Sequence, residues 1–575
     1  MTKLSYTFGW KQANTQQIHI SFDVQGHTKD ELHLELPAWR PGRYEIANFA
    51  KNILSVEATD DAGNELKIFK TSKDSWIVKT PGVHSIRIKS IYYAAILNAG
   101  STYLDEEQLY VNPVNCCFFI PDRANEACQI ILNISDDCRV AIDLPPADGK
   151  FSYSCESFDR LADTPFIASK SLQHKSFEIL DHVFHLWFQG YIKPDFDLLI
   201  NDFKAFANEQ LLTMGKLPGK EFHFMFQILP KPFYHGVEHT YSTVCALGPG
   251  KSVFKAPLYD EFLGVSSHEL FHAWNVKTIR PVEMQPYNFK NENYSRLGWV
   301  YEGITTWYGD QFLLRSGVFD FSQFSKTFNE KLKRHFINYG RHNLSVADSS
   351  FDTWLDGYDA GIPNRKTSIY TEGSLLAFIL DSRIREYTHD AKSLDNVMQL
   401  LYADANEGKA YSNESLINVL DSIAPLDHAK FFSNYIHGTS DFEPLIREGL
   451  NRIGLHIELT KPFTAIEHAF GFRVKDSSST SEILLVAPSS PAEKAGLSTG
   501  DELITLNNRR YDADLYEGDE TVAIHVFSNE VMKVILMQSD GAVWFGSRRL
   551  VVNKNASASQ QAAYKAWSKH ELPQD

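Results

Sequence analysis

The sequence lacks any apolar run near the roughly 18 residues that a membrane-spanning helix needs. Its start, MTKLSYTFGWKQANTQQ, also lacks the apolar core of a signal peptide. Cysteine is scarce, with 6 in 575 residues and none in C-x-x-C spacing. This pattern indicates reduced, buried thiols rather than a disulfide framework or a cysteine metal site. We therefore expect a cytoplasmic protein with no membrane partner.

Positive charge is also in short supply. The chain has 56 Lys and Arg against 72 Asp and Glu, a net charge of -16, and no long acidic run. This balance favours solubility and argues against a nucleic-acid partner. With 43% hydrophobic residues the composition is that of a globular protein, and the length exceeds the roughly 250–300 residues of a single core. We expect several domains.

The hydrophobic periodicity changes along the chain and predicts a multidomain α+β protein. Residues 1–175 alternate apolar and polar positions, as in QIHISFDV and HSIRIKSIYY, and predict a β-rich domain. Residues 176–455 follow a 3.6-residue period and predict a mainly helical domain. Within it, residues 221–230 predict a strand at a sheet edge, followed by a loop over 234–243. Residues 456–555 predict a small β module, and residues 556–575 a C-terminal tail.

The sequence HELFH places two histidines four residues apart. On a helix, His268 and His272 share one face and can direct their ring nitrogens at one cation about 2 Å from each. Glu269 projects about 100° around the helix, so it fits a general base better than a third ligand. The same five residues also occur in helices that bind no metal. A third ligand therefore decides the interpretation.

Glu302 is the candidate for that ligand. It lies among apolar residues in LGWVYEGITTWYGDQFLL, where burying an unpaired carboxylate would cost several kcal/mol. Metal coordination would remove this cost, whereas a surface position at a helix start would avoid it. Two histidines, one glutamate and one open position describe a catalytic zinc site. We predict one Zn²⁺ held by His268, His272 and Glu302.

Two stretches, HELFHAWNVKTIRP and WVYEGITTWYGD, resemble the glycyl aminopeptidase family of PDZ-bearing zinc metallopeptidases. These are gluzincin-type enzymes related to the aminopeptidase N family. The likeness extends beyond the metal motif to Trp274–Lys277, Trp299 and Gly303, while Thr278 departs from it. It implies a thermolysin-like catalytic domain that hydrolyses peptides, with a preference for N-terminal glycine or alanine.

The resemblance also implies residues that handle the substrate. Gly236-Val237-Glu238-His239 is similar to the family's segment at the substrate edge, although His235 stands where a second glycine is common. Glu238 would bind the free α-ammonium, since a charge-assisted bond distinguishes a chain end from an interior amide. A solvated loop glutamate is the alternative.

Tyr370 resembles the family's oxyanion donor. It lies three residues before Gly373 in SIYTEG, but Glu372 replaces the usual lysine of relatives. A tyrosine packed in the core would look the same in sequence. If the resemblance holds, Tyr370 would stabilise the tetrahedral intermediate while Glu269 transfers the proton.

Two further segments resemble the family's flanking domains. Trp39, Pro41, Gly42 and Tyr44 match a turn of its β domain, where Tyr44 would either wall the active site or pack within the domain.

At the other end, AFGF and SPAEKAGLSTGDELITLNN resemble a PDZ domain, whose loop residues Phe470, Gly471 and Phe472 would hold a peptide C-terminus. Residues 510–530 lack the amphipathic helix of such a groove, so a purely structural module is the alternative.

The pattern as a whole predicts a zinc aminopeptidase that acts on peptides with a free N-terminus. An endopeptidase on the same zinc site is one alternative, and a non-catalytic PDZ scaffold that binds peptides is another.

Overall fold

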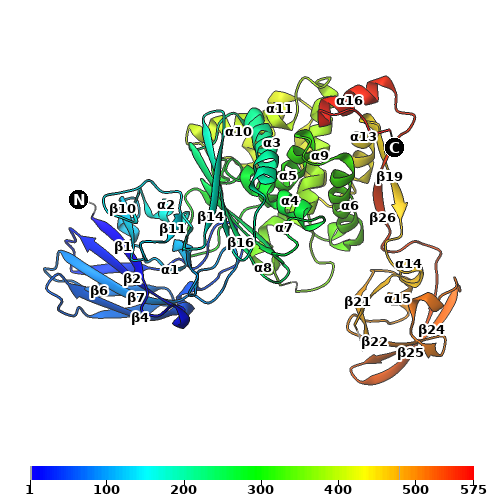
Figure 1. The fold of residues 1–575 in the computed structure, drawn as a ribbon. Coiled ribbons are helices and arrows are strands. Elements are labelled where there is room, and N and C mark those ends of the chain that lie inside the picture. The colour runs from blue at the N-terminus through cyan, green and yellow to red at the C-terminus, as the bar shows by residue number, and fades with distance from the viewer. Residues whose placement is uncertain (1–2, 360, 478, 575) are drawn as a thin grey trace. The chain divides into compact units, whose positions relative to one another are not determined.

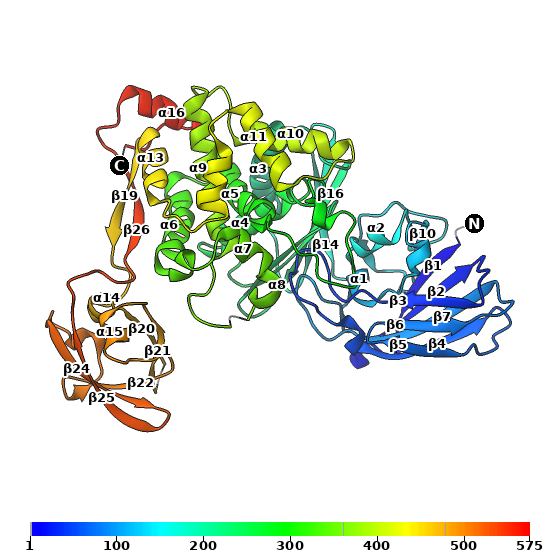
Figure 2. The ribbon, with the colours of Figure 1, turned by 180° about the vertical axis from the view of Figure 1, so that it is seen from behind.

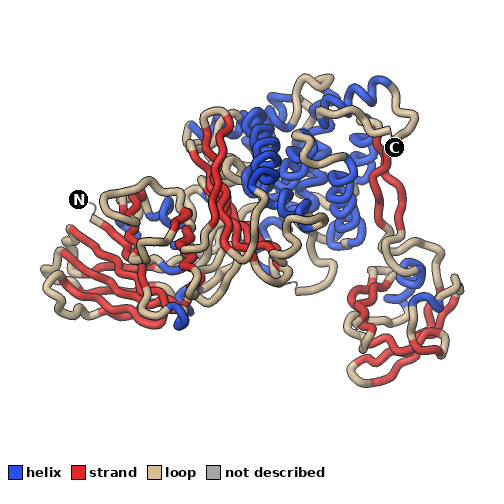
Figure 3. The backbone as a smooth tube through the Cα atoms, in the orientation of Figure 1, coloured by secondary structure: helices blue, strands red, loops and turns tan. Residues whose placement is uncertain are grey.

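The computed structural model describes residues 3–359, 361–477 and 479–574. The chain divides into two compact units, each of which is described by itself (Figure 1). The first unit comprises Met1–Phe319, Phe351–Tyr358 and Leu394–Pro425, and the second comprises Asp320–Ser350, Asp359–Ser393 and Leu426–Asp575. Figure 3 shows the expected change from strands (red) to helices (blue) along the chain. None of the described helices is both long and apolar enough to cross a bilayer.

The N-terminal part of the first unit consists of three sheets, as the alternating pattern predicts. In β2 every second side chain is buried, because successive residues of a strand face opposite sides of the sheet. The six-stranded sheet has the order β12-β10-β1-β2-β7-β4, the three-stranded sheet β3-β6-β5, and the four-stranded sheet β11-β13-β9-β8. The strands are β1 (Leu4–Gly9), β2 (Gln17–Gln25), β3 (Glu31–Glu35), β4 (Ile53–Asp60), β5 (Ile68–Ser72), β6 (Ser75–Lys79), β7 (Ser85–Tyr93), β8 (Tyr103–Leu104), β9 (Gln108–Val111), β10 (Cys128–Leu132), β11 (Arg139–Ala141), β12 (Ser152–Cys155) and β13 (Phe166–Ser169).

A five-stranded sheet of order β14-β15-β16-β18-β17 follows in the same unit. The strand order of this sheet differs from two predictions. Residues 221–228 form β16 inside the sheet rather than at its edge; seven of its eight side chains are buried, as in a parallel strand covered on both faces. The edge is formed by residues 233–238, which are strand β17 and not a loop. The strands are β14 (Gln173–Ile179), β15 (His182–Gln189), β16 (Glu221–Ile228), β17 (Phe233–Glu238) and β18 (Ser242–Gly248).

Aromatic packing fixes the helices of the first unit on this sheet. The Phe226 ring lies 4.7 Å from that of Phe262, and the Phe224 ring 4.9 Å from that of Phe203. Seen from behind in Figure 2, helices α3, α4 and α5 group beside β16. This packing determines the position of α4, which carries HELFH. The helices are α3 (Phe196–Met214), α4 (Leu258–Phe271), α5 (Thr305–Arg315), α8 (Thr353–Asp356), α10 (Leu394–Asn406) and α11 (Asn413–Ile423).

A buried ionic network joins the N-terminal strands to the site region. Asp163, just after helix α2 (Phe158–Ala162), lies 2.7 Å from the Lys277 ammonium and 3.1 Å from the His239 ring. The backbone N–H of Thr240 donates to the same carboxylate at 2.9 Å. Burial alone would raise the pKa of Asp163, but Lys277 and His239 outweigh it and hold this pKa well below its usual range. The network ties the end of β17 to the segment after the HELFH motif.

The second unit contains the other predicted helices and the C-terminal β module. Trp567 of the last helix contacts Phe324 at 5.5 Å and Phe378 at 6.5 Å, so the segment predicted as a tail ends in a packed helix. The helices are α6 (Phe321–Ile337), α9 (Ile369–Tyr387), α12 (His428–Phe431), α13 (Glu443–Arg452), α14 (Ala465–Phe470), α15 (Pro491–Lys494) and α16 (Ala558–Ser568). The strands are β19 (Leu455–Thr460), β20 (Phe472–Asp476), β21 (Ser481–Val486), β22 (Glu502–Leu506), β23 (Arg509–Arg510), β24 (Thr521–Ser528), β25 (Val531–Gln538) and β26 (Ser547–Val552).

The segment expected to form a carboxylate loop is part of the module's core. Phe470 and Phe472 are both fully buried. Gly471 between them has a left-handed φ of 78°, donates its N–H to Glu467 at 2.9 Å and accepts from Ala487 at 2.8 Å. Residues 513–515 form one short 3₁₀ turn before β24, which agrees with the weak helical pattern of residues 510–530.

Lys277→Met should destabilise the protein by about 3–5 kcal/mol, because Asp163 would then stay buried without its ammonium partner. Urea unfolding at pH 7 measures the change. The matched control is Lys170→Met, which breaks an exposed pair with Asp137 and should leave the stability nearly unchanged. Equal losses in the two variants would contradict the prediction.

The same network sets the sign of a pH effect. Because the folded-state pKa of Asp163 is depressed, its stabilisation is complete above the unfolded value of about 3.9 and is lost as the pH falls. Stability should therefore decline below pH ~4, and the decline should be shallower in Lys277→Met.

Candidate metal centre and active site

Helix α4 presents the two histidines of HELFH at its C-terminal end. The Nε2 atoms of His268 and His272 lie 3.0 Å apart, with their rings nearly perpendicular at 84°. His272 is held by its other nitrogen, since Nδ1 donates to the Asn275 carbonyl at 2.6 Å. A carbonyl can only accept, so Nδ1 carries the proton and Nε2 presents its lone pair to the site.

Glu302 approaches the same point from a π-helical turn, Trp299–Ile304, that precedes α5. Its Oε2 lies 3.5 Å from His272 Nε2 and 3.9 Å from His268 Nε2. The carboxylate is 3% exposed. A π-helical turn adds one residue to a helix and redirects the side chains near it, which is common at functional sites.

The three donors fit a zinc ion. Bonds of 2.0–2.1 Å in tetrahedral geometry separate ligand atoms by about 3.3 Å, and the observed separations of 3.0, 3.5 and 3.9 Å bracket that value. Two imidazoles and one carboxylate leave one coordination position open, as in catalytic zinc sites. These residues form one of the groups that can hold a metal ion.

Glu269 lies beside this centre in a position suited to a base. It is 5% exposed, and its Oε2 has no hydrogen-bond partner within the described residues. Burial, together with the charges of Glu238 and Glu302, outweighs the opposing effect of His272 and raises the pKa of Glu269 to about 8. The backbone of Gly236 lies directly against this carboxylate, since a Cβ at Gly236 would lie 2.1 Å from Oε1.

Glu238 ends the edge strand β17 and also points into the site. It is 4% exposed, and its Oε1 is unpaired among the described residues. A loop of the N-terminal strands covers it: Gly42 has a left-handed φ of 78°, and a Cβ there would lie 2.3 Å from Oε2. An unsatisfied buried acceptor costs about 1–3 kcal/mol. The orphaned oxygens of Glu238 and Glu269 therefore indicate a ligand that donates to them.

Tyr44 and Val237 differ from the simplest expectations. Tyr44 is buried, and its hydroxyl donates to Glu302 Oε1 at 2.6 Å. Its ring also packs 5.8 Å from that of Tyr301, so Tyr44 both packs in the core and contacts the Glu302 carboxylate. The Val237 side chain is fully buried in the core, which leaves only its backbone to face a peptide.

Tyr370 belongs to the second unit, on the first turn of α9, and its side chain is 38% exposed. Its role as oxyanion donor stays a prediction. The nearby Glu372 has a structural partner, because His335 Nδ1 lies 2.9 Å from both of its carboxylate oxygens and both residues are buried. This pair accounts for an acidic residue at a position where lysine is usual.

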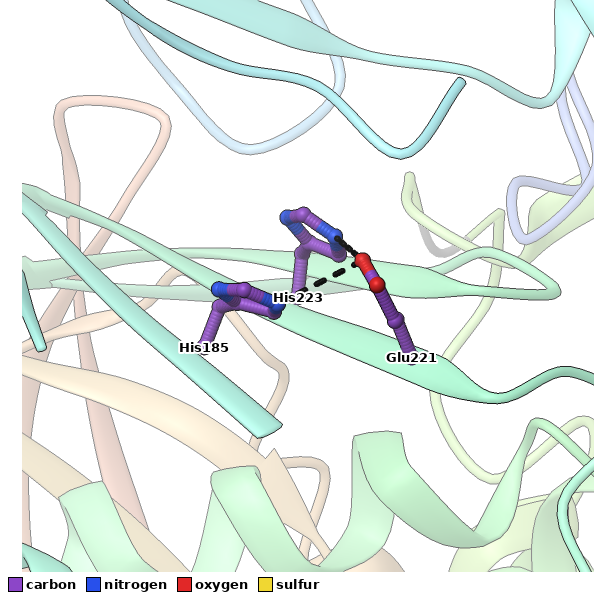
Figure 4. A group of neighbouring side chains, drawn as sticks. All are labelled: His185, Glu221 and His223. Atoms are coloured by element: carbon purple, nitrogen blue, oxygen red, sulfur yellow. Dashed lines mark ion pairs between the residues drawn. The ribbon is translucent and has the colours of Figure 1, made fainter. Parts of the chain in front are cut away.

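A second group of metal-type donors, missed in the sequence, lies on β15 and β16 (Figure 4). Glu221 Oε2 is 3.5 Å from His185 Nε2 and 3.7 Å from His223 Nε2. The indole N–H of Trp187 donates to His223 Nδ1 at 3.1 Å, so a neutral His223 keeps its proton on the nitrogen that faces Glu221. That nitrogen then has no lone pair for a metal. The group is a hydrogen-bonded patch on the sheet.

Tyr44→Phe should weaken metal binding by about 10–100-fold, because Glu302 loses the hydroxyl that orients it. Competition with a chromophoric chelator measures the affinity. Tyr92→Phe is the matched control, since its hydroxyl accepts from Asn52 within the N-terminal sheets. An unchanged metal affinity in Tyr44→Phe would refute this role.

Gly236→Ala should keep its metal and lose about 100-fold in kcat, because the new methyl group displaces the Glu269 carboxylate. Gly264→Ala on the same helix as Glu269 is the control, because a Cβ there meets nothing within 4 Å. Steady-state kinetics with parallel zinc analysis separates the two effects. Full activity in Gly236→Ala would show that Glu269 does not depend on this gap.

Comparison with known proteins relates two segments to one peptidase family. Residues 5–170 match the sequence profile of the peptidase M61 N-terminal domain. Residues 261–376, which include His268, Glu302 and Tyr370, match the profile described as M61 glycyl aminopeptidase. No curated protein sequence matches the chain.

One solved structure in particular shows the same fold. An aminopeptidase N family protein from Idiomarina loihiensis superposes with a TM-score of 0.89 at 24% identity, over 98% of this chain and 100% of that chain. An M1 zinc metallopeptidase from Deinococcus radiodurans gives 0.48 at 10% identity, over 76% and 94% of the two chains. Yeast LTA4 hydrolase gives 0.45 at 13% identity, over 77% and 67%. Over residues 5–170 and 261–376 the chain thus resembles the M61 glycyl aminopeptidase family of peptidases.

Proposed function

We propose that the protein is a zinc-dependent aminopeptidase that releases N-terminal residues from peptides. The observation that carries this proposal is the convergence, in one buried site, of a three-donor set with two further carboxylates, Glu269 and Glu238. A metal, a base and an acceptor for an ammonium group are the components that such a reaction needs. The family's description as glycyl aminopeptidases supports small N-terminal residues, glycine or alanine, as substrates.

Zinc held by His268, His272 and Glu302 would polarise the scissile carbonyl as a Lewis acid and make a nearby water more acidic. Glu269 then does the proton transfer. Its carboxylate would accept the proton of the attacking water and return it to the leaving amine. Tyr370 would donate a hydrogen bond to the oxyanion.

Glu238 gives the reaction its direction along the peptide. Its unpaired, buried oxygen forms a charge-assisted hydrogen bond with a terminal ammonium, which an interior amide cannot supply. The exposed edge of β17 offers backbone groups to an extended peptide. Gly236 and Gly42 leave room around the two carboxylates.

Two alternative functions and the cellular compartment of the protein are also proposals, with less support than the aminopeptidase. An endopeptidase on the same site would not need Glu238. A scaffold that holds a peptide C-terminus at residues 470–472 is disfavoured, since both backbone groups of Gly471 are already hydrogen-bonded. The six cysteines are free, five of them buried, which supports the reducing compartment of a cytoplasmic protein.

Glu269→Gln should retain zinc and lose about 10³-fold in kcat on Gly- and Ala-anilides, because the amide cannot carry the proton. Glu261→Gln, an exposed residue on the first turn of the same helix, is the control and should keep full activity. Zinc analysis and hydrolysis with and without chelator give the measurement. A zinc-loaded wild-type protein that cleaves no peptide would refute the proposed function.

N-terminal acetylation of the substrate distinguishes the two kinds of peptidase. An aminopeptidase that depends on Glu238 should lose cleavage of the acetylated peptide, whereas an endopeptidase should keep it.

A further inference from the structure

A cavity of 430 Å³ lies on the N-terminal loop and the edge strand that border the amine anchor. Basic and polar side chains dominate its lining: Arg40, Arg43, Lys51, Asn98, Ser101 and His235. Glu45 is the single carboxylate among the lining residues. In a chain with a net charge of -16, a concave site of the opposite sign indicates an anionic ligand.

Arg40 is the strongest indication of an anionic ligand in this cavity. It is 4% exposed, and no carboxylate of the described residues lies within 4.0 Å of its guanidinium. Its single hydrogen bond among them runs from Nη1 to the Pro41 carbonyl at 3.1 Å. A guanidinium stays charged in proteins, and burying it without a partner costs several kcal/mol. A ligand carboxylate would remove that cost.

The neighbours of Arg40 shape its surroundings without neutralising it. Arg43 is paired with Glu45 at 2.6 Å and stacks on the Tyr358 ring at 4.0 Å. Burial and the two arginines lower the pKa of His235 to about 3, so its ring is neutral at pH 7 and can donate a hydrogen bond. Arg40 thus remains the one buried cation of this cavity without an acidic partner within 4.0 Å, among the described residues.

The cavity is coupled to the amine anchor through the same loop. Gly42, two residues after Arg40, approaches Glu238 so closely that a Cβ would lie 2.3 Å from Oε2. The negative charge of Glu238 raises the pKa of Arg40 against the effect of burial, so the two groups interact. Once a substrate ammonium occupies Glu238, Arg40 loses that compensation and gains more from an anion.

The cavity lies on the face of β17 opposite to the face that carries Glu238. Side chains alternate along β17, so His235 projects to the face opposite Gly236 and Glu238. A peptide that extends along β17 with its amine at Glu238 would direct alternate side chains toward His235.

We propose that Arg40, with Arg43 and His235, forms a subsite for a substrate carboxylate located within the first three residues of the peptide. This inference rests on the proposed aminopeptidase function and narrows its substrates to peptides that carry an acidic group near the free amine. The carboxylate comes from an acidic side chain or, in a di- or tripeptide, from the C-terminus.

Matched peptides test the proposal. The pair Ala-Glu-Ala-amide and Ala-Gln-Ala-amide varies the side-chain carboxylate, and Ala-Gln-Ala with a free C-terminus varies the other source. Wild-type kcat/KM for alanine release should be about 10-fold higher with a carboxylate than without one. In Arg40→Gln the ratio should fall to about 2-fold or less, while cleavage of the neutral peptide Ala-Gln-Ala-amide should be little affected. Faster cleavage of either carboxylate-bearing peptide supports the subsite and shows whether the bound carboxylate comes from a side chain or from the C-terminus.

A second variant and a second measurement test whether a lost preference in Arg40→Gln results from misfolding. Arg43→Gln, at a half-exposed position of the cavity, should reduce the advantage by a smaller factor. Arg87→Gln should leave it unchanged, because Arg87 on β7 pairs with Asp23 on β2. Calorimetry on zinc-loaded Glu269→Gln, which does not turn over, should show a Kd about 10-fold lower for the acidic peptide than for its neutral twin.

The results distinguish a failure of the carboxylate subsite from a failure of the proposed aminopeptidase function. If the neutral and acidic peptides are cleaved equally fast and bind equally well, the subsite is wrong while the aminopeptidase stands. If no peptide is cleaved by the zinc-loaded wild type, the function is wrong, and the calorimetric comparison still decides whether a carboxylate is bound.

Discussion

Three buried carboxylates around two imidazoles form the electrostatic constraint on which the site depends. Glu238, Glu269 and Glu302 repel one another in a region with little water, and each has to be compensated. Under the proposed function each would be compensated in a different way: Glu302 by hydrogen-bond donors and a metal, Glu269 by a proton, and Glu238 by a substrate ammonium. Three residues of one chemical type acquire three functions through their neighbours.

The N-terminal strands take part in this arrangement, although the metal motif lies elsewhere in the sequence. Their Trp39–Tyr44 loop supplies the hydroxyl on Glu302, the glycine against Glu238 and the unpaired Arg40. Asp163 of the same strand-rich part binds Lys277 just after HELFH. The family profile that covers residues 5–170 therefore describes part of the site and not only a neighbouring domain.

Local patterns predicted what depends on local geometry. The spacing of His268 and His272 and the apolar setting of Glu302 indicated the metal group, because helix periodicity alone determines which residues share a face. Helices α3 and α9 lie within residues 176–455, where the 3.6-residue period predicted mainly helical structure. Strand order depends on pairing between distant segments, so the edge position was assigned to residues 221–230 when it belongs to β17. The pairing of Glu372 with His335 and the burial of Arg40 could not be predicted for the same reason, although two arginines around Pro41-Gly42 in an acidic chain were a readable signal.

The π-helical turn at Trp299–Ile304 makes the metal centre sensitive to register. One extra residue in that turn sets the direction of Glu302, while α5 beyond it packs against α4 through Phe271 and Tyr308, whose rings lie 4.6 Å apart. Loss of a single codon before Glu302 would restore a regular helix and rotate its carboxylate by about 100° relative to that packing. Such a deletion would separate folding from metal binding, and it offers a short evolutionary route from a peptidase to an inactive relative with the same core.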